Sequence, residues 1–388
     1  MVKVLKVLIK KLSIHYFALI YFFVSLAYIP LFKSLNILVF SRWKNIHLSF
    51  NYADEFVKRG LIGSLFYFLD IPLTEKSAEY FFEACYVLFI FSFFLFLKNF
   101  LQERKELFVY FLFLFLLTPA GIPHFVHDIG RFDIINYSLL FLALAIYRPE
   151  NRYFNFLSLV LILLTYFIHE ASFFYTFPSF LLFLLLNEKK RESVLFAGVS
   201  LICFLFIMAF GQYSSLDAQT YFSLKVVPTW GDKTTNSHLV LFRSVTDNLK
   251  YVFCFLSKYR SFSPLEIFLY TLYFGIILAF HTLFSSIFCP KFSWLRLLLF
   301  SLPFWILPLF LVGIDYSRWV SLFFVNSVIA AVFFVKYFSD KHFQLASATP
   351  LLKIYYFVMI IFILFGPLGV IFPFPLFFNY LNKALGKG

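Results

Sequence analysis

Long apolar runs separated by short polar loops dominate the chain. Eleven runs can be marked, at about 16–33, 78–98, 107–121, 134–147, 154–168, 171–187, 194–211, 264–288, 294–312, 319–336 and 351–372. A helix needs about 20 mainly apolar residues to cross the hydrocarbon core of a bilayer, and several runs are shorter than this. The pattern predicts an all-α polytopic integral membrane protein of about eleven transmembrane helices, with residues 1–388 forming a single transmembrane domain.

The first apolar run follows a basic start, as a signal peptide would. No small-x-small cleavage site follows it, so we expect an uncleaved first span. Two loops are long: a first outer loop at 41–77 and a second outer loop at 212–263. In the first, the apolar stretch 61–73 is too short to span, which predicts a re-entrant or interfacial helix. The second is long enough to serve a function beyond connection.

Composition supports the membrane prediction. Hydrophobic residues make up 62% of the chain and charged residues 14%, against about 25% charged in soluble proteins. The net charge of +13 gathers in alternate loops, as membrane orientation requires, so we expect no nucleic-acid partner. These basic loops place the N-terminus in the cytoplasm and the two long loops on the other side.

Four groups of ionisable residues fall in loops of that outer side. They are Asp54, Glu55, Lys58 and Arg59 in NYADEFVKRG; His124, His127, Asp128, Arg131 and Asp133 in PHFVHDIGRFD; the His169–Glu170 pair; and Asp315 with Arg318 in GIDYSRW. Ionisable residues at a lipid boundary are costly unless they are paired or face water. Their gathering at one membrane face indicates a functional site.

Several groups also have a purely structural interpretation. Arg131 could neutralise its neighbours Asp128 and Asp133, and Asp315 with Arg318 has the i,i+3 spacing of a helix ion pair. A metal site is a further alternative, with ligands drawn from His124, His127, Asp128, His169 and Glu170. No HExxH motif is present, and Pro123 and Gly130 indicate a loop around the HxxH pair, so we favour a site with no metal.

Arginines beside carboxylates suit a reaction between a phosphate-bearing substrate and a hydroxyl group. The planar guanidinium binds phosphate in a bidentate manner and stays charged, while a carboxylate or imidazole can accept a proton from a hydroxyl. A lipid-linked diphosphate keeps its tail in the bilayer and its phosphates at headgroup level. Arg59, Arg131 and Arg318 would then stabilise the departing diphosphate.

The layout resembles that of bacterial O-antigen and capsular polysaccharide polymerases of the Wzy type: many short spans, a charged first outer loop, scattered outward Arg, His and acidic residues, and one long outer loop. It is also similar to the wider C-type membrane glycosyltransferases, which often carry an acidic residue in the first outer loop, where this chain has Asp54 or Glu55. The resemblance covers the whole chain in layout. It implies a periplasmic active face and an undecaprenyl-diphosphate-linked glycan donor, without a nucleotide sugar.

We therefore predict a repeat-unit polymerase of the bacterial inner membrane. The expected partners are the lipid-linked oligosaccharide, membrane lipid and a chain-length regulator or other glycan-assembly protein, and no cofactor is expected. Candidate bases or hydroxyl binders are Asp54, Glu55, His127, His169 and Glu170, and the candidate diphosphate ligands are Arg59, Arg131 and Arg318. Other candidate substrate contacts are Asp128, Asp133, Asp315 and Trp230; Trp230 and Tyr221 could stack on sugars, although interfacial anchoring is the commoner role of such residues.

Other functions remain open at this point. A glycosyltransferase that adds one sugar from a polyprenyl-monophosphate donor would have almost the same sequence features. A transporter or flippase of lipid-linked sugars would place binding groups near the bilayer midplane; Glu83, Glu266 and His281 lie in or beside apolar runs. A scaffold or channel is a further alternative, though no polar stripe recurs along several helices.

Overall fold

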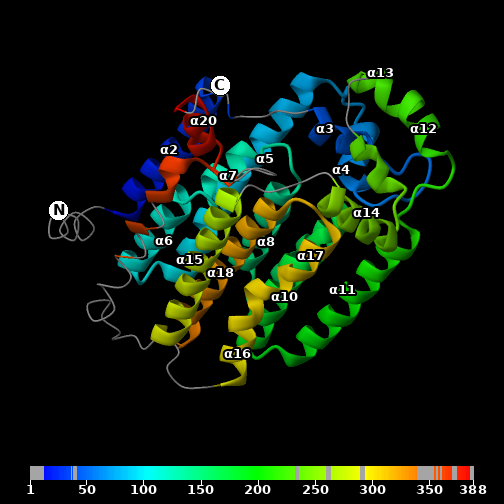
Figure 1. Cartoon of the computed structure of the whole chain (residues 1–388). Coiled ribbons are helices and arrows are strands. Elements are labelled where there is room, and N and C mark those ends of the chain that lie inside the picture. The colour runs from blue at the N-terminus through cyan, green and yellow to red at the C-terminus, as the bar shows by residue number, and fades with distance from the viewer. Residues whose placement is uncertain are drawn as a thin grey trace.

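A computed structural model describes residues 13–35, 37, 42–231, 236–258, 264–288, 293–338, 354, 357–358, 361–368 and 374–384. No β-strand occurs in this part of the chain, so the all-α prediction is confirmed for it. The helices form one bundle with a cap of short helices at one end (Figure 1).

Seven helical segments of the described residues are long and apolar enough to cross a membrane. They are α2 (Ile14–Ser34), α5 (Glu75–Leu101), α6 (Lys105–Leu117) continued by α7 (Ile122–His127), α11 (Lys190–Phe210), α15 (Pro264–Phe288), α16 (Trp294–Ser301) continued through η5 (Leu302–Ile306) into α17 (Leu307–Val312), and α18 (Tyr316–Phe338). These helices give the chain the character of a membrane protein.

Three further apolar helices are shorter. They are α8 (Asp133–Ile146), α9 (Arg152–Ile168) and α10 (Phe173–Leu186), the last preceded by the 3-10 turn η2 (Glu170–Ser172). Ten of the eleven predicted runs thus coincide with helices. Half of the eleventh, 351–372, lies outside the described residues, so the number of spans stays a prediction.

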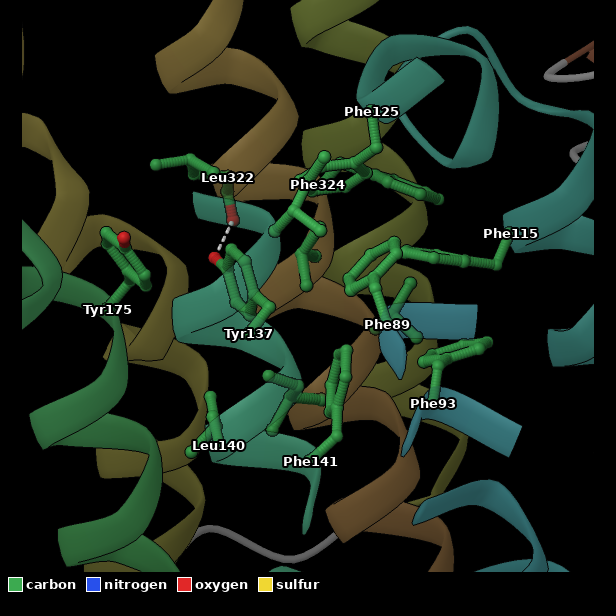
Figure 2. Packing of buried hydrophobic residues seen from close by; sticks show 14 of the residues in the cluster. Phe89, Phe93, Phe115, Phe125, Tyr137, Leu140, Phe141, Tyr175, Leu322 and Phe324 are labelled. Atoms are coloured by element: carbon green, nitrogen blue, oxygen red, sulfur yellow. Dashed lines mark hydrogen bonds between the residues drawn. The ribbon is translucent and has the colours of Figure 1, made fainter. Parts of the chain in front are cut away.

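Helix α18 is the centre of the bundle. In its most apolar window 94% of the residues are buried, against 22% for the peripheral helix α11. Stacked phenylalanines fill the space between the central helices: the Phe93 and Phe115 ring centroids lie 4.1 Å apart, and Phe141 packs against Phe93 (Figure 2). Some hydrogen bonds also cross between buried helices: the Tyr137 hydroxyl donates to Asn326 Oδ1 at 3.1 Å.

The two outer loops form short helices that gather at one end of the bundle, here called the loop end (Figure 1). The first outer loop forms α3 (Arg42–Asn45), η1 (Ile46–Ser49) and α4 (Gly60–Phe68). The second forms α12 (Ala218–Tyr221), the π-helical turn η3 (Phe222–Val226), α13 (Val227–Trp230), η4 (Asn236–Leu241) and α14 (Val245–Lys258). The other end, where α15 leads to α16, is called the opposite end.

Helix α4 is the short apolar helix expected at 61–73. Its C-terminal side leaves Leu65, Tyr67 and Phe68 exposed, which fits a helix that faces lipid or an interface. Its inner side packs closely on the preceding segment: a Cβ on Gly63 would lie 2.0 Å from the Phe50 carbonyl oxygen. Glycine is therefore required there for the helix to approach the backbone.

The arrangement predicts that residues at the two ends are accessible from opposite sides of a membrane. Tyr153 is exposed at the start of α9, at the opposite end, and Lys225 is exposed at the loop end. In a chain freed of its native cysteines, Tyr153→Cys and Lys225→Cys should react with an impermeant thiol reagent from opposite faces of sealed vesicles. Labelling of both from one face would contradict the fold.

Candidate functional site

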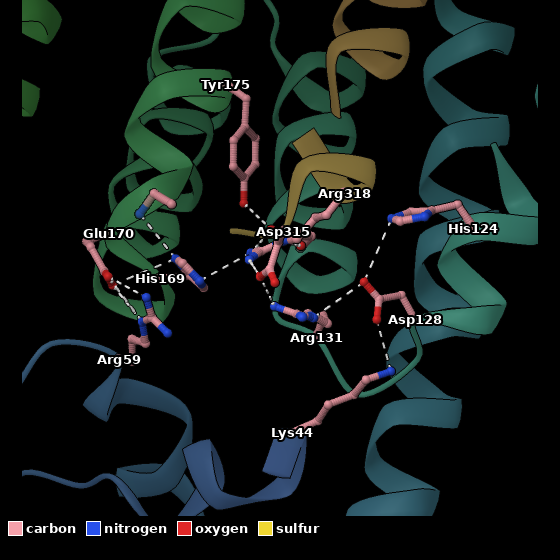
Figure 3. Close-up of polar contacts among 12 residues, drawn as sticks. Lys44, Arg59, His124, Asp128, Arg131, His169, Glu170, Tyr175, Asp315 and Arg318 are labelled. Atoms are coloured by element: carbon pink, nitrogen blue, oxygen red, sulfur yellow. Dashed lines mark hydrogen bonds and ion pairs between the residues drawn. The ribbon is translucent and has the colours of Figure 1, made fainter. Parts of the chain in front are cut away.

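The loop end of the bundle holds a continuous chain of ion pairs, here called the charged network (Figure 3). The charged network lies where α7 and α9 end and where α8, η2 and α18 begin. It joins these helix ends to the first outer loop. Its charged members are four bases and four acids: Lys44, Arg59, Arg131, Arg318, Asp128, Asp133, Glu170 and Asp315. Segments far apart in sequence thus meet at one place.

Arg318 lies at the centre of the charged network. Its Nε and Nη2 donate to the two carboxylate oxygens of Asp133, at 2.5 and 2.8 Å, in a bidentate pair. Its Nη1 reaches Asp315 Oδ2 at 3.3 Å. Asp133 is the first residue of α8, where the helix dipole favours a negative charge, and it also accepts from the Tyr175 hydroxyl at 3.0 Å. Both partners are buried, so this pair ties α8 to α18.

The charged network continues from Asp315 towards α7. Arg131 Nη1 donates to Asp315 Oδ2 at 2.7 Å, and Arg131 Nε lies 3.4 Å from Asp128 Oδ2. Lys44 Nζ, from α3, lies 3.0 Å from Asp128 Oδ1 and donates to the Ile129 carbonyl. The i,i+3 pairing of Arg131 with Asp128 is therefore present, but it is one link in a longer chain.

The turn that carries Arg131 depends on a glycine. Gly130 has a φ of +104°, a conformation that side chains rarely adopt, and a Cβ there would lie 3.2 Å from Lys44 Cδ. The glycine thus lets Lys44 pass close to the turn and reach Asp128. Although burial alone raises the pKa of the Asp128 carboxyl, Lys44 and Arg131 outweigh it and hold this pKa well below its ordinary range.

Arg59 and Glu170 form the other part of the charged network. The Arg59 Nε and Nη2 groups donate to both carboxylate oxygens of Glu170, with distances of 2.6 to 3.1 Å. Arg59 precedes α4 with a φ of 64°, in the left-handed region that non-glycine residues occupy at some cost. The neighbouring Lys58 amide donates to the Gly211 carbonyl, which anchors this strained turn.

His169 bridges the two parts. Its Nε2 lies 3.2 Å from Arg318 Nη2, and its Nδ1 lies 3.1 Å from the Ala171 amide nitrogen and 3.7 Å from Glu170 Oε2. Burial, with the Arg59 guanidinium next in importance, lowers the pKa of His169 well below its usual value. The imidazole is therefore neutral at pH 7, and its single acceptor nitrogen takes a hydrogen bond from either the Ala171 amide or Arg318, not from both.

The charges of the network cancel, because four bases face four acids and His169 is neutral. The members differ in exposure, however. The side chains of Asp315 (20%), Glu170 (14%) and Arg59 (13%) reach the surface, whereas Arg131 (9%) is buried and Arg318 and Asp133 are 4% exposed. An incoming ligand would therefore meet the Arg59–Glu170 pair and Asp315 first, while Arg131 and Arg318 lie behind them.

The acidic residues of the first outer loop have different partners. Asp54 pairs with Lys225 at 2.9 Å, and Glu55 accepts from the Ser214 amide and hydroxyl at 2.7 Å each. These contacts bind the first outer loop to the second. Neither carboxylate contacts the charged network, so the geometry favours a structural role over that of base.

Three other predicted residues lie in apolar or closed surroundings. Trp230 is buried and its Nε1 donates to Ser49 Oγ at 2.6 Å, so its ring does not face a sugar site. Tyr221 is buried against Tyr213. His127, at the end of α7, has a buried Nδ1 with no hydrogen-bond partner among the described residues.

Lys44 and His47 also lie at the site, although no pattern in the sequence singles them out. Both follow the predicted first span, in the segment RWKNIH, where a lysine and a histidine look like ordinary loop residues. The His47 ring packs at 5.1 Å from Phe50 and 5.9 Å from Phe132. Burial, and the nearby Arg59, lower its pKa well below the usual value, so it is a neutral imidazole beside the charged network.

The histidines and acids do not assemble as metal ligands in the described part of the chain, where no group of three or more has suitable geometry. His124 instead bonds the Leu368 carbonyl through Nδ1 and lies 3.8 Å from Asp128. Comparison of the chain with known families, with curated proteins and with solved structures found no match.

The central pair predicts a large effect on stability. Arg318→Met leaves the Asp133 carboxylate buried without its main partner, which should cost about 3–5 kcal/mol of unfolding free energy. Adding Asp133→Asn removes that charge and should restore much of the loss. Thermal unfolding of the purified protein would measure both variants.

Lys33→Met serves as the control, because Lys33 and Glu79 form an exposed ion pair at 2.8 Å. Its effect should stay below about 1 kcal/mol. If Arg318→Met were no more damaging than Lys33→Met, or if the double variant were worse than Arg318→Met alone, the central role of the pair would be refuted.

Proposed function

We propose that this protein is a membrane glycosyltransferase that polymerises lipid-linked oligosaccharide repeat units at the periplasmic face of a bacterial inner membrane. The observation that carries the proposal is the charged network: arginines, carboxylates and a neutral histidine from remote segments meet at one end of an apolar bundle. Such a cluster suits a substrate whose tail lies in lipid and whose phosphates lie at its surface.

The distribution of basic residues supports the orientation. Clusters of Lys and Arg occur in the loops at the opposite end: Lys98, Arg104 and Lys105; Arg148 and Arg152; Lys189, Lys190 and Arg191; and Lys336. Short loops rich in Lys and Arg stay in the cytoplasm. The opposite end is then cytoplasmic, as is the N-terminus, and the charged network faces the periplasm.

The partly exposed ion pairs suggest how a diphosphate would bind. Because the network is neutral, a diphosphate must replace a carboxylate on a guanidinium rather than enter an empty cationic site. Exchange at Arg59 would transfer its two N–H donors from Glu170 to the phosphate oxygens, and Arg131 would exchange in the same way with Asp315. Arg318 stays with Asp133 and positions the others.

This exchange would also free a base. Glu170, once released by Arg59, can accept the proton of the acceptor sugar hydroxyl. The hydroxyl oxygen then bonds to the anomeric carbon of the donor, and the bond from that carbon to the diphosphate oxygen breaks. The diphosphate leaves with the bonding electrons, stabilised by Arg59 and Arg131. His169 and His47 are neutral and close enough to orient the hydroxyl or to accept its proton.

The position of the charges favours this function over transport. A transporter of lipid-linked sugars would hold its binding groups near the bilayer midplane. Here the charged network joins residues at helix ends, such as Asp133 and Asp315 at the starts of α8 and α18. The geometry therefore favours chemistry at the membrane surface.

Arg59→Gln and Arg131→Gln test the proposal, with Arg243→Gln as a matched control. Arg243 also lies at the loop end, but its guanidinium packs over Tyr251 at 4.2 Å and outside the network. Each network variant should reduce glycan polymer at least a hundredfold and cause single lipid-linked repeat units to accumulate, because one charged contact to the leaving group is lost. Mass spectrometry of extracted lipid-linked glycans would measure this.

Normal polymer in both network variants at normal protein level would rule out the mechanism. Products longer by one sugar, instead of multiples of a repeat unit, would indicate the single-sugar transferase. An unchanged product that accumulates on the cytoplasmic leaflet would indicate a flippase.

A further inference from the structure

A cavity lined by hydroxyl groups, an arginine and two apolar side chains lies at the opposite end, away from the charged network. It sits between the last turns of α15 and the first turns of α16 and has a volume of about 280 Å³. Its lining residues are Thr282, Ser285, Ser286, Arg296, Leu297 and Phe300. One water occupies about 30 Å³ of liquid, so the cavity has room for a polar group several times larger.

The cavity contains an arginine that pairs with no carboxylate among the residues described. Arg296 Nε donates to Ser285 Oγ at 3.4 Å. The three arginines of the charged network, by contrast, all contact carboxylates. A half-buried guanidinium of this kind favours an anion.

The hydroxyl groups specify the anion further. Ser285 Oγ accepts from Arg296, which leaves its own hydrogen to donate to a phosphate oxygen. The Thr282 and Ser286 hydroxyls already donate to the Leu278 and Thr282 carbonyls, so their oxygens can only accept. The cavity thus offers donors to a phosphate and acceptors to neighbouring hydroxyls. A phosphate ester that carries a polyol matches both.

The surface around the cavity is that of a membrane interface. Trp294 and Leu297, in the first turn of α16, are exposed, and tryptophan is enriched at the headgroup level of membranes. Basic cavities between transmembrane helices are known to bind the headgroups of anionic lipids. We propose that this cavity binds the phosphate headgroup of an anionic phospholipid with a polyol headgroup, of which phosphatidylglycerol is the simplest, and that the lipid joins α15 to α16.

The proposal does not depend on the glycan reaction and can be tested on purified full-length protein in detergent. Phosphatidylglycerol, phosphatidylcholine and inorganic phosphate are added separately, and bound lipid is counted by native mass spectrometry while the thermal midpoint is recorded. Phosphatidylglycerol should bind and raise the midpoint of the wild type. Phosphatidylcholine and inorganic phosphate at equal concentration should do neither.

Arg296→Gln should weaken phosphatidylglycerol binding about tenfold, because a charge-assisted bond is lost. Arg148→Gln is the matched control at the same end, since its guanidinium donates only to the Ala145 and Tyr147 carbonyls, and it should bind as the wild type does. Thr282→Val keeps the shape of an exposed side chain and should weaken binding about threefold, so the test remains valid if Arg296→Gln fails to fold.

Equal affinity of wild type, Arg296→Gln and Thr282→Val for phosphatidylglycerol would overturn the proposal, as would equal binding of phosphatidylcholine. If inorganic phosphate raised the thermal midpoint as much as phosphatidylglycerol does, the anion would be free phosphate and not a lipid headgroup, and the proposal would be wrong.

Discussion

Charges within an apolar bundle must be neutralised, and the pair between Arg318 and Asp133 is where this protein meets that constraint. Two buried ions in bidentate contact fix the start of α8 against the first turns of α18. Removing either ion alone would leave the other buried and unpaired, which is far more costly than losing the pair as a whole. The same guanidinium also contacts Asp315 and His169, so the pair positions the next members of the charged network.

The same constraint limits what the site can do. Because each arginine of the charged network contacts a carboxylate, the proposed diphosphate would bind by exchange of partners. The partly exposed pairs, Arg59 with Glu170 and Arg131 with Asp315, are the ones that can exchange without opening the bundle. Substrate binding and release of the base would then be a single event. A free carboxylate would be present only when a diphosphate occupies its arginine.

Individual residues show which parts of the fold and of the charged network can be predicted from the sequence. The helices follow directly from the apolar runs, because length and hydropathy are local properties. The Asp315–Arg318 pair was expected from its i,i+3 spacing and is present at 3.3 Å. The stronger partner of Arg318 is Asp133, 185 positions away, and only the packing of α8 against α18 brings the two together. Lys44 and His47 gave no signal, since a single base in a loop looks like any other.

The predicted residues of the two outer loops have further partners in the structure. The resemblance favours Asp54 and Glu55 because similar layouts carry an acid there, and their carboxylates contact Lys225 and Ser214 of the second outer loop. Trp230, a candidate for stacking on a sugar, is buried and donates to Ser49. All three residues hold the two outer loops together, and their roles in substrate binding stay predictions.

The central claim is that Glu170 and a diphosphate compete for Arg59. A binding measurement shows whether removal of the Glu170 charge strengthens or weakens the binding of a diphosphate. A short-chain polyprenyl diphosphate is titrated into wild-type protein and into Glu170→Gln, with the dissociation constant measured by calorimetry. If the carboxylate must be displaced, Glu170→Gln should bind the diphosphate about tenfold more tightly, although it has lost the proposed base. Equal or weaker binding by Glu170→Gln would show that Arg59 does not exchange partners, and the account would fail.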